Sequence, residues 1–121
     1  MALIEAQEVP EINIENSRRI ETLHAWINNH LDDCHSLRTL SQLAGMSISK
    51  MQRLFGDRYG CTVFAYIRVE RLRRAQKQLE VTVMNIKSIS AGAGYSSVPA
   101  FTAAFSHAFG QPPARFRRRT K

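Results

Sequence analysis

The chain has 121 residues, enough for one domain or for two very small subdomains that share a linker. Hydrophobic residues make up 44% of it, so it can bury a core and is not a disordered chain. No apolar run approaches the roughly 18 residues of a membrane-spanning helix, and the acidic N-terminal stretch does not look like a signal peptide. Two cysteines are too few for a disulfide scaffold, and a reducing cytoplasm fits them best.

The net charge of +7 is divided unevenly along the chain. Residues 1–35 hold seven acidic and two basic side chains, a net charge of −5, whereas residues 36–121 hold 15 Lys and Arg against three acids, a net charge of +12. The high positive charge of residues 36–121 favours a polyanionic partner, either a nucleic acid or an anionic membrane surface. A basic fold can also be merely soluble, so charge alone does not identify the partner.

The chain begins with a segment that shows no regular pattern. Residues 1–16 lack sustained periodicity and contain Pro10, so we expect a flexible acidic lead. From Ser17 to Leu31 the apolar residues recur along one stripe and predict a helix with a single buried face. That stripe consists of Ile20, Leu23, Ile27 and Leu31.

The stretch from Ser36 to Gly60 predicts two short helices joined by a glycine turn. Ser36 and Ser47 are suitable N-caps, and Gly45 stands where a left-handed residue is needed between the helices. The second helix has an apolar face and an opposite polar face made of Ser49, Lys50, Gln52, Arg53 and Asp57. This pattern is typical of a helix-turn-helix. For one such stretch, a helical hairpin whose outer face is merely solvated is an equal alternative.

A long helix is predicted next. Thr62 is a plausible cap, and nothing from Val63 to Glu80 breaks a helix. Its apolar residues face a core, and the rest of its surface is cationic, with Arg68, Arg71, Arg73, Arg74 and Lys77. A basic amphipathic helix can bind a membrane or a partner groove. Here its apolar face is needed to hold two halves together, so a connecting helix is the simpler interpretation.

The helix-turn-helix pattern then returns. At a constant offset of 49, Leu37, Leu40, Ser41, Ala44, Gly45, Met46 and Ser47 match Ile86, Ile89, Ser90, Ala93, Gly94, Tyr95 and Ser96. Beyond the turn the offset is 50, and Met51, Phe55, Tyr59 and Gly60 match Phe101, Phe105, Phe109 and Gly110. A repeat that preserves both the turn and the aromatic face is a specific signal and not the expected result of chance.

The C-terminal stretch is rich in proline and arginine. Pro112 and Pro113 end one helix and pre-set the start of a short last one, which Phe116 can anchor to the core. The arginines that follow can be a phosphate clamp or a solvated tail, and we favour the clamp.

Taken together, these linked motifs resemble the DNA-binding domain of the AraC/XylS family of bacterial transcription regulators, over roughly Ser17 to Arg117. The resemblance implies an all-α fold of about seven helices, with two helix-turn-helix subdomains bridged by a long central helix. The domain organisation that we predict is a flexible acidic N-terminal segment at 1–16, a first helix-turn-helix subdomain at 17–62, the connecting helix at 63–80, and a second helix-turn-helix subdomain with a basic tail at 81–121. The chain can be a free-standing regulator or the C-terminal part of a longer one.

Two recognition helices on one linker would enter successive major grooves of double-stranded DNA, about 34 Å apart, and a monomer would suffice for this. The expected base-reading residues are Ser49, Lys50, Gln52, Arg53, Pro99, Thr102, Ala103 and Ser106. Arg53 can bond a guanine edge with two hydrogen bonds, and Gln52 an adenine edge. Arg53 can alternatively be a solvent-facing charge or part of an intramolecular pair.

The second recognition helix departs from the family pattern, which commonly has Arg where this chain has Ala103. Pro99 is tolerable in the first turn, where its missing N–H would have no partner. We therefore expect base specificity to come mainly from the first helix, and the second half to bind mostly through backbone and shape. Phosphate contacts are expected from Ser47, Ser97, Arg68, Arg71, Arg74, Arg115, Arg117 and Arg118.

Other function classes fit the sequence less well. There is no Cys, His and acid set for catalysis, and Cys34 and His35 have no second pair at a zinc-site spacing, so we expect neither an enzyme, a metal nor a cofactor. A DNA- or RNA-coating protein without sequence preference is the main alternative, followed by an adaptor that binds only protein. The family resemblance implies activation through contact with RNA polymerase.

Overall fold

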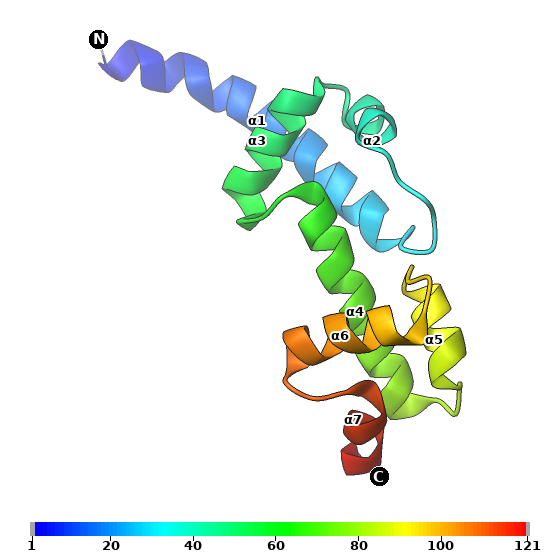
Figure 1. The fold of residues 1–121 in the computed structure, drawn as a ribbon. Helices are drawn as coiled ribbons and strands as arrows, with labels where there is room; N and C mark the ends of the chain where they lie inside the picture. The colour runs from blue at the N-terminus through cyan, green and yellow to red at the C-terminus, as the bar shows by residue number, and fades with distance from the viewer. Residues whose placement is uncertain (1, 121) are drawn as a thin grey trace. The chain divides into compact units, whose positions relative to one another are not determined.

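The computed structural model describes the backbone of residues 2–120 and the side chains of residues 14–118. The described residues form helices and no strands, in the order α1 (Ala2–Asn28), α2 (Leu37–Ala44), α3 (Ile48–Tyr59), α4 (Val63–Val81), α5 (Ile86–Gly92), α6 (Val98–Phe109) and α7 (Pro113–Thr120) (Figure 1). The prediction of about seven helices in an all-α fold is confirmed. The chain forms two compact units, Met1–Ala65 and Tyr66–Lys121, which we call unit 1 and unit 2.

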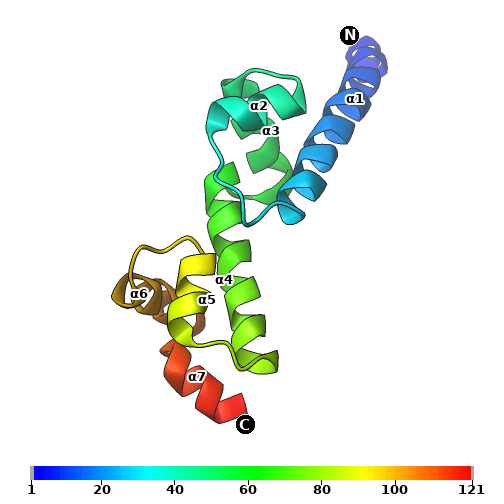
Figure 2. The same ribbon diagram turned by 90° about the vertical axis from the view of Figure 1, so that its right-hand side faces the viewer.

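Unit 1 is built on the C-terminal half of α1. Helices α2 and α3 both pack against α1 and against each other (Figures 1 and 2). The three-, then four-residue spacing of Ile20, Leu23 and Ile27 places them on one side of α1, and all three are fully buried. The other buried apolar residues of unit 1 are Leu40 and Ala44 of α2, Met51 and Phe55 of α3, and Val63 at the start of α4. The predicted stripe is therefore the core face of α1.

Local sequence signals fix where the helices of unit 1 begin and end. The Ser36 hydroxyl accepts a hydrogen bond from Thr39 N, and the Ser47 hydroxyl accepts one from Lys50 N. Between them Gly45 has φ +70°, a left-handed conformation that side chains with a Cβ rarely adopt. The Thr62 hydroxyl accepts from Ala65 N at 3.1 Å and caps α4. These predicted caps and the predicted turn are all confirmed.

Unit 2 surrounds the remainder of α4. The core joins residues from α4, from α5 and its C-cap, and from α6, namely Leu72, Ala75, Leu79, Ile89, Ala93, Phe101 and Phe105. Helix α7 begins at the buried Pro113 and packs on α6, with Phe116 against the core at 5.7 Å from the Phe105 ring. Phe116 is thus the anchor that the sequence predicted.

The burial pattern confirms the internal repeat residue by residue. The order of buried, half-buried and exposed residues over 37–47 recurs without change over 86–96, at an offset of 49. The order over 51–63 likewise recurs over 101–113, at an offset of 50. The capping roles correct one detail, because Ser97 and not Ser96 caps α6 in the way that Ser47 caps α3. Ser96 is the extra residue, so the second turn is one residue longer.

The repeat also includes the first helix of each unit, which the sequence analysis missed. At an offset of 52, Ile20, Leu23 and Ile27 of α1 match Leu72, Ala75 and Leu79 of α4, and all six are buried. The sequence did contain a signal for this, because both predicted helices have apolar residues at the same three-, then four-residue spacing. We call α1 and α4 the supporting helices of units 1 and 2. The predicted recognition helices, α3 and α6, pack on α1 and α4 respectively.

The start of α1 differs from the expectation. We predicted a flexible lead over residues 1–16 and a helix from Ser17, whereas α1 begins at Ala2. Ala and Glu residues in this stretch favour helix, whereas Pro10 disfavours it, so the repeated helix formers and not the proline agree with the observed helix. The side chains of residues 1–13 lie outside the described part of the structure.

Candidate nucleic-acid interface

Helix α3 presents a polar outward face next to the first turn. Ser49 and Arg53 are both exposed and stand one helical turn apart, followed by the exposed Asp57. Lys50 is half-buried, and its backbone N–H is used by the Ser47 cap. The guanidinium of Arg53 thus stands on the outer side of α3, opposite the buried Met51 and Phe55.

Gln52 has an intramolecular contact that the sequence did not indicate. It is half-buried, and its side-chain Oε1 accepts a hydrogen bond from Val63 N, the first residue of α4, at 3.3 Å. Gln52 and Thr62 therefore both satisfy backbone donors at the start of α4. To bond adenine through both Oε1 and Nε2, Gln52 would have to share its Oε1 between Val63 N and the base, or release Val63 N.

Helix α6 presents a different outward face. Its exposed residues include Pro99, Ala100, Ala103 and His107, so methyl and methylene groups dominate the surface that corresponds to Ser49 and Arg53. Thr102 and Ser106, two of the predicted base-reading residues, are half-buried. Pro99 lies in the first turn of α6, as predicted.

An arginine from the supporting helix contacts each helix-turn-helix. Arg19 Nη1 donates to the Gly45 carbonyl at 2.9 Å, and its Nε is paired with Glu15 at 3.2 Å. In unit 2, Arg74 Nη2 donates to the Gly92 carbonyl at 2.8 Å. Cations at these positions complement the carbonyl ends of α2 and α5. Arg74 was predicted to contact phosphate, and this bond engages part of its guanidinium; Arg19 was not predicted at all.

The C-terminal arginines divide into two kinds. Arg117 is half-buried and donates through Nε to the Leu79 carbonyl at 3.2 Å and through Nη2 to the Thr82 carbonyl at 3.3 Å, so it ties α7 to the end of α4. Arg115 and Arg118 are exposed on α7. All three arginines are predicted from the sequence to contact phosphate, because their spacing alone does not show that Arg117 bonds to α4 and to the residue after it.

Serines cap the N-termini of both recognition helices, α3 and α6. The hydroxyls of Ser47 and Ser97 accept from Lys50 N and Ala100 N, both at 3.2 Å. A phosphate at either end could accept from the remaining backbone N–H groups of the first turn, and also from the serine O–H, because the cap bond uses only the serine oxygen as an acceptor.

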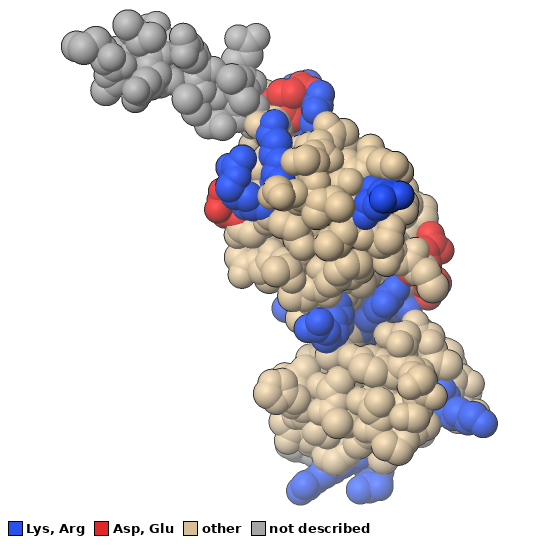
Figure 3. Space-filling view, turned by 45° about the horizontal axis from the view of Figure 1, so that its top comes forward, with Lys and Arg blue, Asp and Glu red and all other residues tan. Residues whose placement is uncertain are grey.

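On the face shown in Figure 3, Lys and Arg side chains outnumber Asp and Glu side chains in both units. Ion pairs among the described residues include Arg19–Glu15, Arg58–Glu21 and Arg73–Glu70. Burial raises the pKa of Tyr59 and of Tyr95 above the usual value of 10.0, against smaller opposing effects of nearby arginines. Among the described residues, no helix is long and apolar enough to cross a membrane, and no group of three or more His, Cys, Asp or Glu could hold a metal ion.

Comparisons with known proteins agree with this geometry. Residues 40–119 match a family model described as a helix-turn-helix domain. The chain is 37% identical over 99 residues to the right origin-binding protein of Escherichia coli strain K12, covering 82% of this chain and 34% of that protein. It is 32% identical over 100 residues to the regulatory protein SoxS of Salmonella typhimurium, covering 83% of this chain and 94% of SoxS. The chain thus spans about a third of the first relative and nearly all of the second.

Solved structures show the same fold. The DNA-binding domain of AdpA, a global transcriptional factor crystallised with a target DNA, is similar with a TM-score of 0.77 and 25% identity, over 83% of this chain and 90% of that one. An AraC-type regulator from Chromobacterium violaceum has a TM-score of 0.80 at 23% identity, over 86% and 93% of the two chains. The chain belongs to the AraC/XylS family of helix-turn-helix DNA-binding transcription regulators, a family of regulators and not of enzymes.

Proposed function

We propose that this protein binds a specific double-stranded DNA site through both recognition helices and takes most of its base specificity from α3. The observation that carries this is the contrast between two equivalent outward faces. On α3, Ser49 and Arg53 offer a hydroxyl and a guanidinium, whereas on α6, Pro99 and Ala103 stand at the same positions. Only the first face can make a bidentate contact with guanine.

The α6 face supports a different kind of contact. The methyl group of Ala103 and the ring of Pro99 can pack on thymine methyl groups, and the hydroxyls of Thr102 and Ser106 can each make a single bond. Such contacts discriminate weakly between bases. The second half of the site would therefore be held largely through its backbone and its shape.

Phosphate contacts would come from exposed cations around the two recognition helices. Arg68, Arg115 and Arg118 are exposed and fit this role best. Arg71, Arg74 and Arg117 fit it less well, since each has contacts within its own unit. The N–H groups that follow Ser47 and Ser97 can bind phosphate in addition.

The repeat supports the view that a monomer suffices, because one chain carries two recognition helices. We propose further that the protein works in the cytoplasm and activates transcription by contacting RNA polymerase. The similarity to the regulatory protein SoxS over 94% of its length supports a regulatory role.

Selection of binding sites from a random duplex library, at a stated salt concentration, tests this function. We expect a motif of two unequal blocks, centred about 10–11 base pairs apart, with the greater information in one block. Arg53→Ala should cost ~1–3 kcal/mol of binding free energy and relax one base position in that block. Equal information in both blocks would contradict the assignment of specificity to α3, and tight binding without any motif would favour a coating protein.

A further inference from the structure

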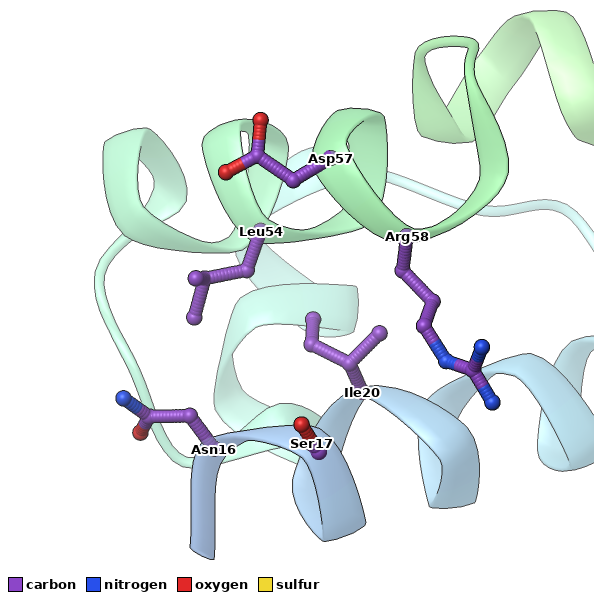
Figure 4. A pocket seen from close by; sticks show the side chains of 6 residues that line it. All are labelled: Asn16, Ser17, Ile20, Leu54, Asp57 and Arg58. Carbon is purple, nitrogen blue, oxygen red and sulfur yellow. The ribbon is translucent and has the colours of Figure 1, made fainter. Parts of the chain in front are cut away.

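Each unit has a hollow between its supporting helix and its recognition helix, and the two hollows occupy equivalent positions of the repeat. In unit 1 a cavity of about 260 Å³ is lined by Asn16, Ser17, Ile20, Leu54, Asp57 and Arg58 (Figure 4). In unit 2 a cavity of about 490 Å³ is lined at the matching positions by Arg68, Val69, Leu72, Ala104, His107 and Ala108. The offsets are the same ones that relate the helices, 52 for the supporting helix and 50 for the recognition helix.

The hollow of unit 1 is bridged by its own side chains. Arg58 and Leu54 extend from α3 toward α1, where Ile20 points back at them (Figure 4). Arg58 Nη2 pairs with Glu21 Oε2 of α1 at 2.8 Å, so a charge pair spans the two helices. Little apolar surface is left for a ligand to cover.

The hollow of unit 2 lacks this bridge because three residues differ. Ala104 and Ala108 replace Leu54 and Arg58, and Arg73 replaces Glu21. Two small side chains leave the volume empty, and an alanine cannot form an ion pair with α4. The cavity is accordingly nearly twice as large.

The walls and the rim of this second hollow differ in chemistry. The walls are apolar, with Leu72, Phe109 and Val69, the last of which is 43% exposed although it is a large hydrophobic residue. The lining also includes three basic residues, Arg68, Arg73 and His107, all of them exposed to solvent. The nearest acid on the same helix is Glu70, which pairs with Arg73 at 3.3 Å. A guest with an apolar body and a negative charge complements both features.

We propose that the hollow between α4 and α6 binds a small organic anion, consisting of an apolar body and a carboxylate. Its volume lies within the range of small-molecule sites, about 300–1,000 Å³. The apolar body would cover Val69 and Phe109, and the carboxylate would lie near Arg68 or Arg73. Ala104 and Ala108, which open the hollow, lie on the flank of α6 away from Pro99 and Ala103, whereas Arg68 is shared with the proposed phosphate contacts and His107 with the outward face of α6. The inference rests on the hollow and its lining and not on the proposed function.

Titration of the ¹⁵N-labelled protein with 2-naphthoate, followed by NMR, tests the site directly. We expect saturable amide shifts at Val69, Leu72, Ala104 and Phe109, with a Kd on the order of 1 mM, as for other ligands of this size. The uncharged analogue 2-naphthamide should bind at least about fivefold more weakly. No saturable shift at these residues would overturn the proposal, and equal binding of the amide would overturn the assignment of an anion.

Two variants rebuild the features of unit 1 in unit 2 and serve as matched controls. Ala104→Leu fills the hollow as Leu54 does, and the double variant Arg73→Glu with Ala108→Arg restores the Glu21–Arg58 bridge. Each should weaken 2-naphthoate binding at least tenfold while the melting temperature stays within a few degrees. If a variant fails to fold, the other still decides the question. Unchanged binding in a folded variant of either kind would show that the anion lies elsewhere.

Discussion

Tyr95 and Met46 occupy the same place in the two turns but differ in polarity. The Tyr95 ring packs against Phe101, with 5.7 Å between the ring centroids. Its hydroxyl is buried, and no hydrogen-bond partner for it is found among the described residues. Met46, at the equivalent position of unit 1, has no polar hydrogen to satisfy. The hydroxyl of Tyr95 therefore loses its bond to water on folding without regaining one.

Replacing Tyr95 with Phe should stabilise the protein. Removing an unsatisfied buried hydroxyl while keeping the ring is expected to raise the free energy of unfolding by ~1 kcal/mol. Urea denaturation at neutral pH measures this. A clear loss of stability would mean that the hydroxyl has a bonding partner in solution.

The same tyrosine makes stability depend on alkaline pH. Burial raises the pKa of Tyr95 in the folded state, so the unfolded chain ionises first as the pH rises above 10. The stability contributed by the neutral ring is complete below pH 10 and is lost as the pH rises through the folded-state pKa. Tyr59, whose pKa is also raised by burial, shares in this loss. Denaturation between pH 9 and 11 should therefore show a shallower decline for Tyr95→Phe, not a flat one.

Gly92 and Gly94 provide a matched pair at the second turn. Gly94 has φ +89°, so Gly94→Ala should lower the free energy of unfolding by ~1 kcal/mol, and the new Cβ would also lie 3.1 Å from Arg71 Nη1. Gly92 ends α5 without a positive φ and with open space around it, so Gly92→Ala should raise stability by ~0.5 kcal/mol. Thermal melting of both variants checks the opposite signs. Equal effects would contradict the assigned turn geometry.

At the scale of helices, local signals were predictable and tertiary bonds were not. The caps at Ser36 and Ser47 depend on a residue three positions away, so the sequence carries them almost completely, whereas the extra residue of the second turn moves the cap of α6 from Ser96 to Ser97. The contact of Gln52 with Val63 joins two helices across a turn, and that of Arg117 with Leu79 spans 38 positions. No periodicity encodes such bonds. The residues predicted to contact DNA therefore include exposed ones, such as Arg53, and ones that bond within the protein, such as Gln52 and Arg117.

The contrast between α3 and α6 predicts different responses to a change in the DNA. Replacing thymine with deoxyuracil removes only the methyl group, which is worth ~0.8 kcal/mol when fully buried. In the half-site contacted by α6, we expect such replacement at a contacted position to weaken binding about twofold to fourfold, and in the other half-site much less. Affinity measurements on duplexes with single replacements test this.

The matched protein variant for that measurement is Ala103→Ser, which keeps the size of the side chain but makes it polar. It should bind the thymine and deoxyuracil duplexes with more nearly equal affinity than the wild type. If deoxyuracil weakens both half-sites alike, methyl groups are not read preferentially by α6.

At the scale of the whole molecule, the charge of residues 36–121 sets the salt dependence of binding. Each arginine that contacts a phosphate releases a counterion, so it steepens the plot of log affinity against log salt by about 0.9. An arginine that is hydrogen-bonded within the protein adds to the free energy of unfolding and not to the salt slope. Arg118 and Arg117, neighbours on α7, belong to these two kinds: Arg118 is exposed, and Arg117 is bonded to the Leu79 and Thr82 carbonyls.

Substituting each of the two with Gln should separate the roles. Arg118→Gln should weaken binding to all DNA sequences alike and flatten the salt slope by about one unit, with an unchanged melting temperature. Arg117→Gln should instead lower the free energy of unfolding by ~1–3 kcal/mol, because two bonds from a charged group are lost at the junction of α7 with α4. Fluorescence anisotropy at several salt concentrations, with thermal melting of the same samples, gives both quantities. If Arg117→Gln flattens the slope at full stability, Arg117 turns outward to the phosphate and its bonds to the carbonyls do not hold α7 in place.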